Sequence, residues 1–113
     1  MLKNKTKQRI IITKKEIITN ILGKAIGLMF RTKVEKALIF VNSRESYTPL
    51  HMFFVFCPID VLYLNSEKKV VELKENFFPF TVFHPRKMAR YIIELPSGSI
   101  KKSHTMIGDE LRF

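Results

Sequence analysis

The feature that most constrains this chain is its longest apolar stretch, residues 51 to 65 (HMFFVFCPIDVLYLN), which carries one carboxylate, Asp60. His51, Pro58 and Asp60 interrupt the stretch well short of the roughly 20 apolar residues that a membrane-spanning helix needs. The stretch therefore predicts strands in a protein core. An ionised carboxylate in such surroundings is costly unless hydrogen-bond donors or a cation satisfy it, so Asp60 is expected to have specific partners.

Short apolar segments separated by turn residues predict a mainly β protein of the α+β class. The expected strands cover residues 8–12, 37–41, 51–56, 59–64, 69–75, 89–95 and 111–113. Asn65 to Lys68 has the composition of a turn, so 59–64 and 69–75 are expected to form a hairpin. A short helix is expected within residues 100–106. We expect these elements to build a small β-sandwich or a closed barrel.

One amphipathic helix is expected near the N-terminus, from about Lys14 to about Gly27. Thr13 and Glu16 have the spacing of a capping box, which marks helix starts. Apolar residues then recur at helical intervals, at Ile17, Ile18, Ile21, Leu22, Ala25, Ile26 and Met29. We interpret this stripe as a face that packs on the core rather than as a groove for a partner.

The length of 113 residues fits one domain, which we expect to span residues 8–113 after a flexible basic lead-in of residues 1–7. The single cysteine, Cys57, excludes an internal disulfide and fits a reducing compartment. Lys14, Lys15 and Glu16 interrupt any signal-like apolar region near the N-terminus. We therefore expect a cytoplasmic protein that does not enter a membrane.

The net charge of +10 is concentrated in the first third of the chain. Residues 1–36 contain ten Lys and Arg residues against Glu16 and Glu35. Such an excess indicates either solvated surface or a contact with nucleic acid or anionic lipid. Lys outnumbers Arg, and the stretch lacks the interleaved aromatic residues that stack on bases, so we favour solvated surface.

The order of several short motifs resembles a known family over about residues 13–113. The motifs are Gly27–Arg31, Met52, Pro58–Val61, Tyr91–Gly98 and Gly108–Asp109. Together they are similar to the prokaryotic "domain of unknown function" family numbered 192, and the absence of a signal peptide fits its archaeal-type members. The resemblance implies a compact, β-sandwich-like fold. It implies no activity, because that family is itself uncharacterised.

Three acids are candidates for chemistry: Asp60, Glu94 and Asp109. Two neighbouring acids can act as an acid–base pair or hold a divalent cation, which would suit a hydrolase or a lyase. The alternative is structural, with Asp60 accepting backbone N–H bonds and Glu94 pairing with Arg31 or Arg90. We favour the structural roles.

An irregular segment rich in phenylalanine and basic residues runs from Phe77 to Arg90. Exposed aromatic rings beside cations suit a ligand surface for a sugar, a base or a peptide, whereas buried rings would close one end of the core. We favour a surface that binds a ligand. Its expected residues are Phe78, Phe80, His84, Arg86 and Arg90, with Asp60 and Glu94 as buried contacts.

No metal or cofactor is expected. His51, His84, His104 and Cys57 do not have the spacing of a zinc site, and neither a glycine-rich phosphate loop nor a G-x-S-x-G nucleophile motif occurs. The favoured function is a small non-catalytic domain that binds a ligand or a protein. The alternatives are an enzyme using the three acids, and nucleic-acid binding through the basic first third.

Overall fold

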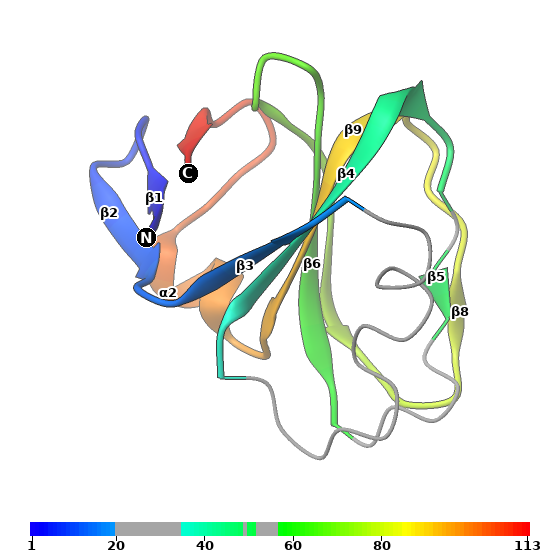
Figure 1. Ribbon diagram of the computed structural model, residues 1–113. Helices are drawn as coiled ribbons and strands as arrows, with labels where there is room; N and C mark the ends of the chain where they lie inside the picture. The colour runs from blue at the N-terminus through cyan, green and yellow to red at the C-terminus, as the bar shows by residue number, and fades with distance from the viewer. Residues whose placement is uncertain (20–34, 49, 52–56) are drawn as a thin grey trace.

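A five-stranded sheet forms the centre of the computed structural model, which describes residues 1–19, 35–48, 50–51 and 57–113 (Figure 1). Its strands, in spatial order, are β3 (Lys15–Ile18), β4 (Ala37–Ser46), β9 (Ala89–Pro96), β6 (Ile59–Leu64) and β7 (Val70–Phe77). β3 runs parallel to β4, and every other neighbouring pair is antiparallel. The β6–β7 pair confirms the predicted hairpin.

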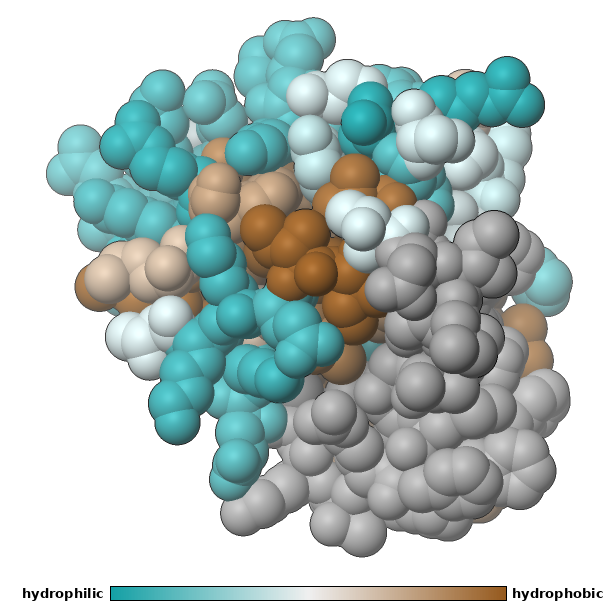
Figure 2. Space-filling model, viewed as in Figure 1, coloured by the Kyte–Doolittle hydropathy of each residue, from teal (hydrophilic) through white to brown (hydrophobic). Residues whose placement is uncertain are grey.

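Smaller elements lie on both sides of the central sheet (Figure 1). One group joins the two chain ends, because β1 pairs with β2 and with β10. It consists of β1 (Leu2–Asn4), β2 (Arg9–Ile12), β10 (Leu111–Arg112) and the short helix α2 (Ser99–Ser103). The other group is the two-stranded pair of β5 (Leu50–His51) and β8 (Val82–Phe83). Figure 2 shows mainly hydrophilic residues over the side on which β1 and β2 lie.

The two faces of the central sheet each carry a buried apolar cluster. All six residues of β6 are buried, which places the second half of the long apolar stretch in the core, as predicted. Side chains alternate between the faces of a strand. One face, called here the Asp60 face, contacts β1, β10 and α2 through residues that include Leu2, Leu62, Ile93, Leu95, Ile100 and Leu111. The other, called here the Glu94 face, includes Leu38, Phe40, Val61, Tyr63, Ile92 and the half-buried Phe83 of β8.

The prediction of an amphipathic helix from Lys14 to Gly27 is wrong for its first turn. Lys15–Ile18 forms β3, and its backbone pairs in parallel register with Ala37–Phe40. Ile18 is buried whereas Ile17 is 51% exposed, which is the alternation of a strand. Pairing with β4 overrides the helical spacing of the apolar residues. Residues 20–27 of the predicted helix lie outside the described residues.

Glu16, the supposed capping-box residue, accepts a hydrogen bond from Lys36 at 2.6 Å and does not cap a helix. The helix that the structure does describe lies near the C-terminus, at α2, where a short helix was expected from residues 100–106. The expected lead-in contains β1, and both Leu2 and Asn4 are fully buried.

The prediction of a closed barrel is also wrong. β3 and β7 are the outer strands of the central sheet and are not paired with each other, so the sheet is open. β4 extends beyond the predicted strand 37–41, as far as Ser46. The predicted strand 51–56 falls mostly outside the described residues. Among the described residues, no helix is long and apolar enough to cross a membrane.

Candidate functional site

Asp60 is a buried structural acid. Its side chain is fully buried on β6, opposite Leu95 on the Asp60 face. Its Oδ1 atom accepts a hydrogen bond from the backbone N–H of Asn76 at 3.0 Å, and its Oδ2 atom accepts one from Ile100 N–H at 2.9 Å. The Ile100 N–H belongs to the first turn of α2, where backbone donors lack partners within the helix. Asp60 therefore ties the end of β7 and the start of α2 to the central sheet.

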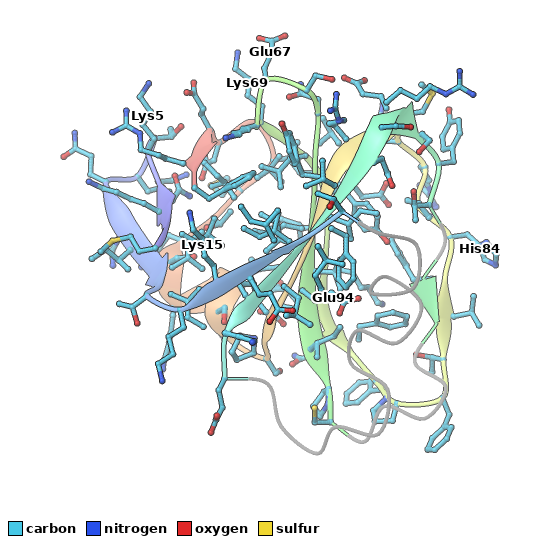
Figure 3. The ribbon with its side chains drawn as sticks, viewed as in Figure 1. Lys5, Lys15, Glu67, Lys69, His84 and Glu94 are labelled. Carbon is cyan, nitrogen blue, oxygen red and sulfur yellow. The ribbon has the colours of Figure 1, made fainter. Side chains whose placement is uncertain are left out.

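Glu94 is buried, and one of its carboxylate oxygens lacks such a partner among the described residues. Only 9% of the residue is exposed, and its Oε2 atom has no hydrogen-bond partner among the described residues. Burial raises the pKa of Glu94 to about 8, because an ionised carboxylate loses its water there. Figure 3 shows the side chain pointing from the central sheet into the interior. Arg31 lies outside the described residues, and no hydrogen bond or ion pair joins Glu94 to Arg90 within the described chain.

Tyr63 is a functional candidate that the sequence analysis missed. It is fully buried, and its hydroxyl also lacks a hydrogen-bond partner among the described residues. Burial is the main cause that raises the pKa of Tyr63, and the nearby acids Glu72 and Glu94 raise it further. The only signal in the sequence was a tyrosine among the aliphatic residues of a strand expected to be buried. A buried tyrosine hydroxyl usually has a hydrogen-bond partner, and the sequence offered no obvious one.

Register places Tyr63 and Glu94 side by side. Tyr63 is opposite Ile92, and Val61 is opposite Glu94, on the antiparallel pair β6–β9. Directly opposite residues point to the same face, so Tyr63 and Glu94 are diagonal neighbours on that face. Such neighbours are roughly 7–8 Å apart at the backbone, within reach of long side chains. Phe83 of β8 covers Tyr63, with ring centroids 5.8 Å apart.

The three acids proposed for catalysis do not converge. Asp60 and Glu94 point to opposite faces of the central sheet, because their register partners Leu95 and Val61 belong to different core clusters. The predicted ligand contacts Asp60 and Glu94 therefore lie on different faces of the sheet. The arrangement needed for a hydrolase or lyase that uses the three acids together is therefore absent.

Asp109 instead joins the two ends of the chain. Its carboxylate pairs with Lys7 Nζ at 2.8 Å and accepts hydrogen bonds at 3.0 Å from Asn4 Nδ2 and Met106 N–H. Burial acts to raise the pKa of Asp109, but the bonds from Lys7, Asn4 and Met106 outweigh it and lower the pKa. Gly108, with φ of +96°, forms the turn before it. Asp109 has a structural role as complete as that of Asp60.

The aromatic–basic segment, defined here as residues 78–88, is largely exposed. Phe78 and Phe80 are 61% and 58% exposed, whereas Phe77 is buried and Phe83 is half-buried against it. The phenylalanines of this region thus divide into two that pack on the core and two that face outward. Phe80 also has a positive φ of 62°, a conformation that side chains with a Cβ rarely adopt.

The basic residues of this segment face solvent while its backbone is fixed. Glu72 on β7 accepts hydrogen bonds from the backbone N–H groups of Arg86 at 2.7 Å and Lys87 at 3.1 Å. The side chains of His84, Arg86 and Lys87 are exposed, and Figure 3 shows His84 projecting outward. Arg90 differs from them, because it is partly buried and its Nε atom has no hydrogen-bond partner among the described residues. Its guanidinium lies 5.9 Å from the ring centroid of Tyr91.

A metal centre is not evident in the described part of the chain, which has no group of three His, Cys, Asp or Glu side chains placed to hold an ion. Cys57 is a partly buried neighbour of the Glu94 face, and burial raises the pKa of its thiol.

A family model described as "Uncharacterized ACR, COG1430" (DUF192) matches residues 2–113. The chain belongs to the DUF192 family. This confirms the resemblance found from the motifs. Among its DUF192 relatives, the UPF0127 protein of Thermococcus sibiricus is 37% identical over 113 residues, which cover 98% of this chain and 73% of that protein. The UPF0127 protein of Pyrococcus abyssi is 36% identical over 102 residues, which cover 88% of this chain and 86% of that protein.

Two crystal structures share the fold of this DUF192 chain. A protein of unknown function from Novosphingobium aromaticivorans aligns with a TM-score of 0.87 and 20% identity, over 99% of this chain and 82% of that one. A protein from Sinorhizobium meliloti named a "putative transcription regulator" aligns with a TM-score of 0.81 and 22% identity, over 87% of this chain and 79% of that one. At these identities the likeness shows the fold alone.

Proposed function

We propose that this DUF192 domain is a non-catalytic binding domain, and that the aromatic–basic segment binds an acidic segment of another protein. The observation that carries the proposal is the exposure of Phe78, Phe80, Val82 and Met88, each at least 42% exposed, beside the exposed cations His84, Arg86 and Lys87. Apolar rings next to cations suit a chain that alternates acidic and apolar side chains.

The way in which the segment is held supports binding without large rearrangement. Phe77 and Phe83 pack on the Glu94 face, and Glu72 fixes the backbone at Arg86 and Lys87. These contacts fix the backbone near the exposed side chains, so less conformational entropy is lost when a partner binds. The net charge of +10 favours an anionic partner through long-range attraction.

Binding can be tested by following backbone amide shifts in NMR while a synthetic peptide of alternating Glu and Phe is added. We expect shifts concentrated in residues 78–88 and saturation of the signal. Charge reversal at two positions, Arg86→Glu with Lys87→Glu, should weaken binding at least tenfold, since both side chains are exposed. The matched control is Lys101→Glu with Lys102→Glu, an exposed basic pair on α2. Equal weakening by both double variants, or shifts confined to other surfaces, would reject the proposal.

A second candidate function is nucleic-acid binding through the basic first third of the chain. It is favoured by the ten Lys and Arg residues among positions 1–36 and agrees with the name given to the Sinorhizobium meliloti protein. Against it, Lys5, Lys7 and Lys36 each form an ion pair with an acid. A single-stranded oligonucleotide titrated at several salt concentrations distinguishes the two, because phosphate contacts make affinity fall steeply with salt.

A further inference from the structure

Three buried side-chain atoms have no hydrogen-bond partner among the described residues: the Tyr63 hydroxyl, Oε2 of Glu94 and Nε of Arg90. The Tyr63 hydroxyl and Glu94 Oε2 belong to residues of the Glu94 face, and both are shielded from solvent. Buried polar groups in folded proteins are nearly always hydrogen-bonded, so each exception calls for a physical explanation. These two are diagonal neighbours in the β6–β9 register. Their neighbourhood points to one missing partner that serves both.

Aromatic rings pack around Tyr63, and one lysine ammonium lies near them. Phe83 lies 5.8 Å from Tyr63 and 6.2 Å from Phe77, measured between ring centroids. The ring of Phe83 also lies near an ammonium group, because Lys74 Nζ is 5.8 Å from its centroid. Aromatic faces attract cations, and the effect grows when water is excluded.

We propose that the Glu94 face binds a small organic ammonium ion, with its charged group between Glu94 and the Tyr63 hydroxyl and its apolar part against Phe83. A cation supplies what Glu94 lacks, and the rings can contact both the charge and the carbon atoms attached to it. This site differs from the exposed surface of residues 78–88 and does not depend on that surface binding a partner.

Other classes of ligand fit less well. An anion would face Glu94 and would also lie near Glu72, which influences Tyr63 electrostatically. A divalent metal ion needs several oxygen ligands, and the described residues provide no group of three suitable side chains. An organic cation needs only one carboxylate when aromatic rings complete its surroundings.

Binding of such a cation should release a proton from Glu94. Burial raises the pKa of Glu94 to about 8, so the acid is protonated at neutral pH without a ligand. A bound ammonium ion favours the ionised form, and the proton leaves to water. Charged or titratable groups also lie on this side of the sheet or on its neighbouring strands. Those among the described residues are Glu16 with Lys36, Cys57, Tyr63, Glu72, Lys74 and Arg90.

The experiment titrates the full chain with n-butylammonium chloride and, separately, with sodium acetate, and records amide and Glu94 side-chain carboxyl NMR signals. We expect n-butylammonium to shift the signals of Tyr63, Ile92 and Glu94 to saturation, with Glu94 becoming ionised. Acetate should leave these signals unchanged. The variant Glu94→Gln should weaken binding at least tenfold, and Tyr63→Phe should weaken it several-fold.

The control variant is Glu67→Gln, whose side chain is 75% exposed and whose binding should equal that of the original chain. Equal affinity of Glu94→Gln and the original chain would overturn the proposal. So would tighter binding of acetate than of n-butylammonium, or a Glu94 that is already ionised at pH 6 without ligand. The last result would mean that a cation of the chain itself pairs with Glu94. Tetramethylammonium, which carries no proton, distinguishes attraction by the rings from hydrogen bonding to Glu94.

Discussion

Asp60 and Glu94 lie on adjacent central strands, β6 and β9, yet they have opposite surroundings. Asp60 accepts two backbone hydrogen bonds, from Asn76 and Ile100, and so fixes α2 to the sheet. Glu94 is similarly buried, but its Oε2 atom has no partner among the described residues. The difference teaches that burial of an acid does not itself indicate a function. An acid whose hydrogen bonds are complete is part of the architecture, whereas an acid with an unpartnered buried oxygen either destabilises the fold or marks a site.

The largest effect is expected from Asp60→Ala. The substitution removes the acceptor from the buried N–H group of Ile100 and from the partly buried one of Asn76, and a hydrogen bond to a charged group contributes about 1.5–3 kcal/mol. We expect a loss of roughly 3 kcal/mol in the free energy of unfolding, measured with urea. The exposed acid Glu67 gives the control, since Glu67→Ala should change stability by less than about 0.5 kcal/mol. A loss for Asp60→Ala below about 1 kcal/mol would contradict the structural role.

Glu94→Gln should act in the opposite direction. The unfolded chain releases the Glu94 proton near pH 4.5, whereas the folded chain holds it to about pH 8. The folded state therefore binds more protons in this window, and the stability of the original chain falls as pH rises from 4.5 to 8. Glutamine does not titrate, so the variant should be more stable at pH 9. The pKa rise corresponds to at most about 5 kcal/mol at roughly 1.4 kcal/mol per pKa unit, and relaxation of the folded chain around the buried charge should reduce the difference to about 2 kcal/mol.

Urea unfolding at pH 4 and pH 9 measures this effect. The advantage of Glu94→Gln should be absent at pH 4, because Glu94 is then protonated in both states. A variant that is less stable than the original chain at pH 9 would show that Glu94 is ionised and paired in the folded protein. Glu94 would then resemble Asp60, and the contrast between the two faces would disappear.

Asp109 offers an intermediate case, because its partners include a partly exposed lysine. The folded-state pKa is lowered, so its contribution to stability is complete above the ordinary value near 3.8 and is lost as pH falls through the folded-state value. Asp109→Asn should cost about 1–2 kcal/mol near neutral pH, since the ion pair with Lys7 is lost. Thermal unfolding between pH 2 and pH 7 should show this cost shrinking in strong acid. A cost that does not change with pH would show that Asp109 acts through its shape alone.

The smallest effect is expected from Phe78→Ala. Its ring is 61% exposed, so removal should change the free energy of unfolding by less than about 0.5 kcal/mol. The matched comparison is Phe83→Ala, which removes a ring that packs on Tyr63 and Phe77 and should cost at least about 1 kcal/mol. Urea unfolding of both variants separates exposed rings from core rings. A cost for Phe78→Ala equal to that for Phe83→Ala would mean that both rings close the core.

Most strands could be predicted because their signals are local. Residues 59–64 and 89–95 are rich in apolar residues, several of them β-branched, and both lie within observed strands, β6 and β9. The prediction at residues 14–18 failed because Ile17 and Ile18 suit either a helix face or a strand edge. Pairing with β4, whose first residue is about 20 positions later, decided between them. Such pairing depends on long-range contacts that no local pattern contains.

The candidate site was only partly predictable. Glu94 became a candidate because an acid in an apolar strand is conspicuous, and Phe78 and Phe80 because their rings lie near cations in the sequence. Tyr63 was missed because tyrosine is common in strands. Only the structure shows that its hydroxyl has no hydrogen-bond partner among the described residues. Asp60 was grouped with Glu94 although the two acids lie on opposite faces, because sequence spacing does not tell which face of the sheet residues on different strands occupy.

The sequence by itself determined that the chain is mainly β, that residues 59–64 are buried and that the chain is strongly basic. These properties depend on composition and on the local pattern of apolar residues. Tertiary structure decided that Lys15–Ile18 is an edge strand, that the sheet stays open and that Asp60 and Glu94 face opposite ways. The physical reason is register. A shift of one residue between β6 and β9 would bring a different set of side chains together, and only the packing of the whole core selects among those shifts.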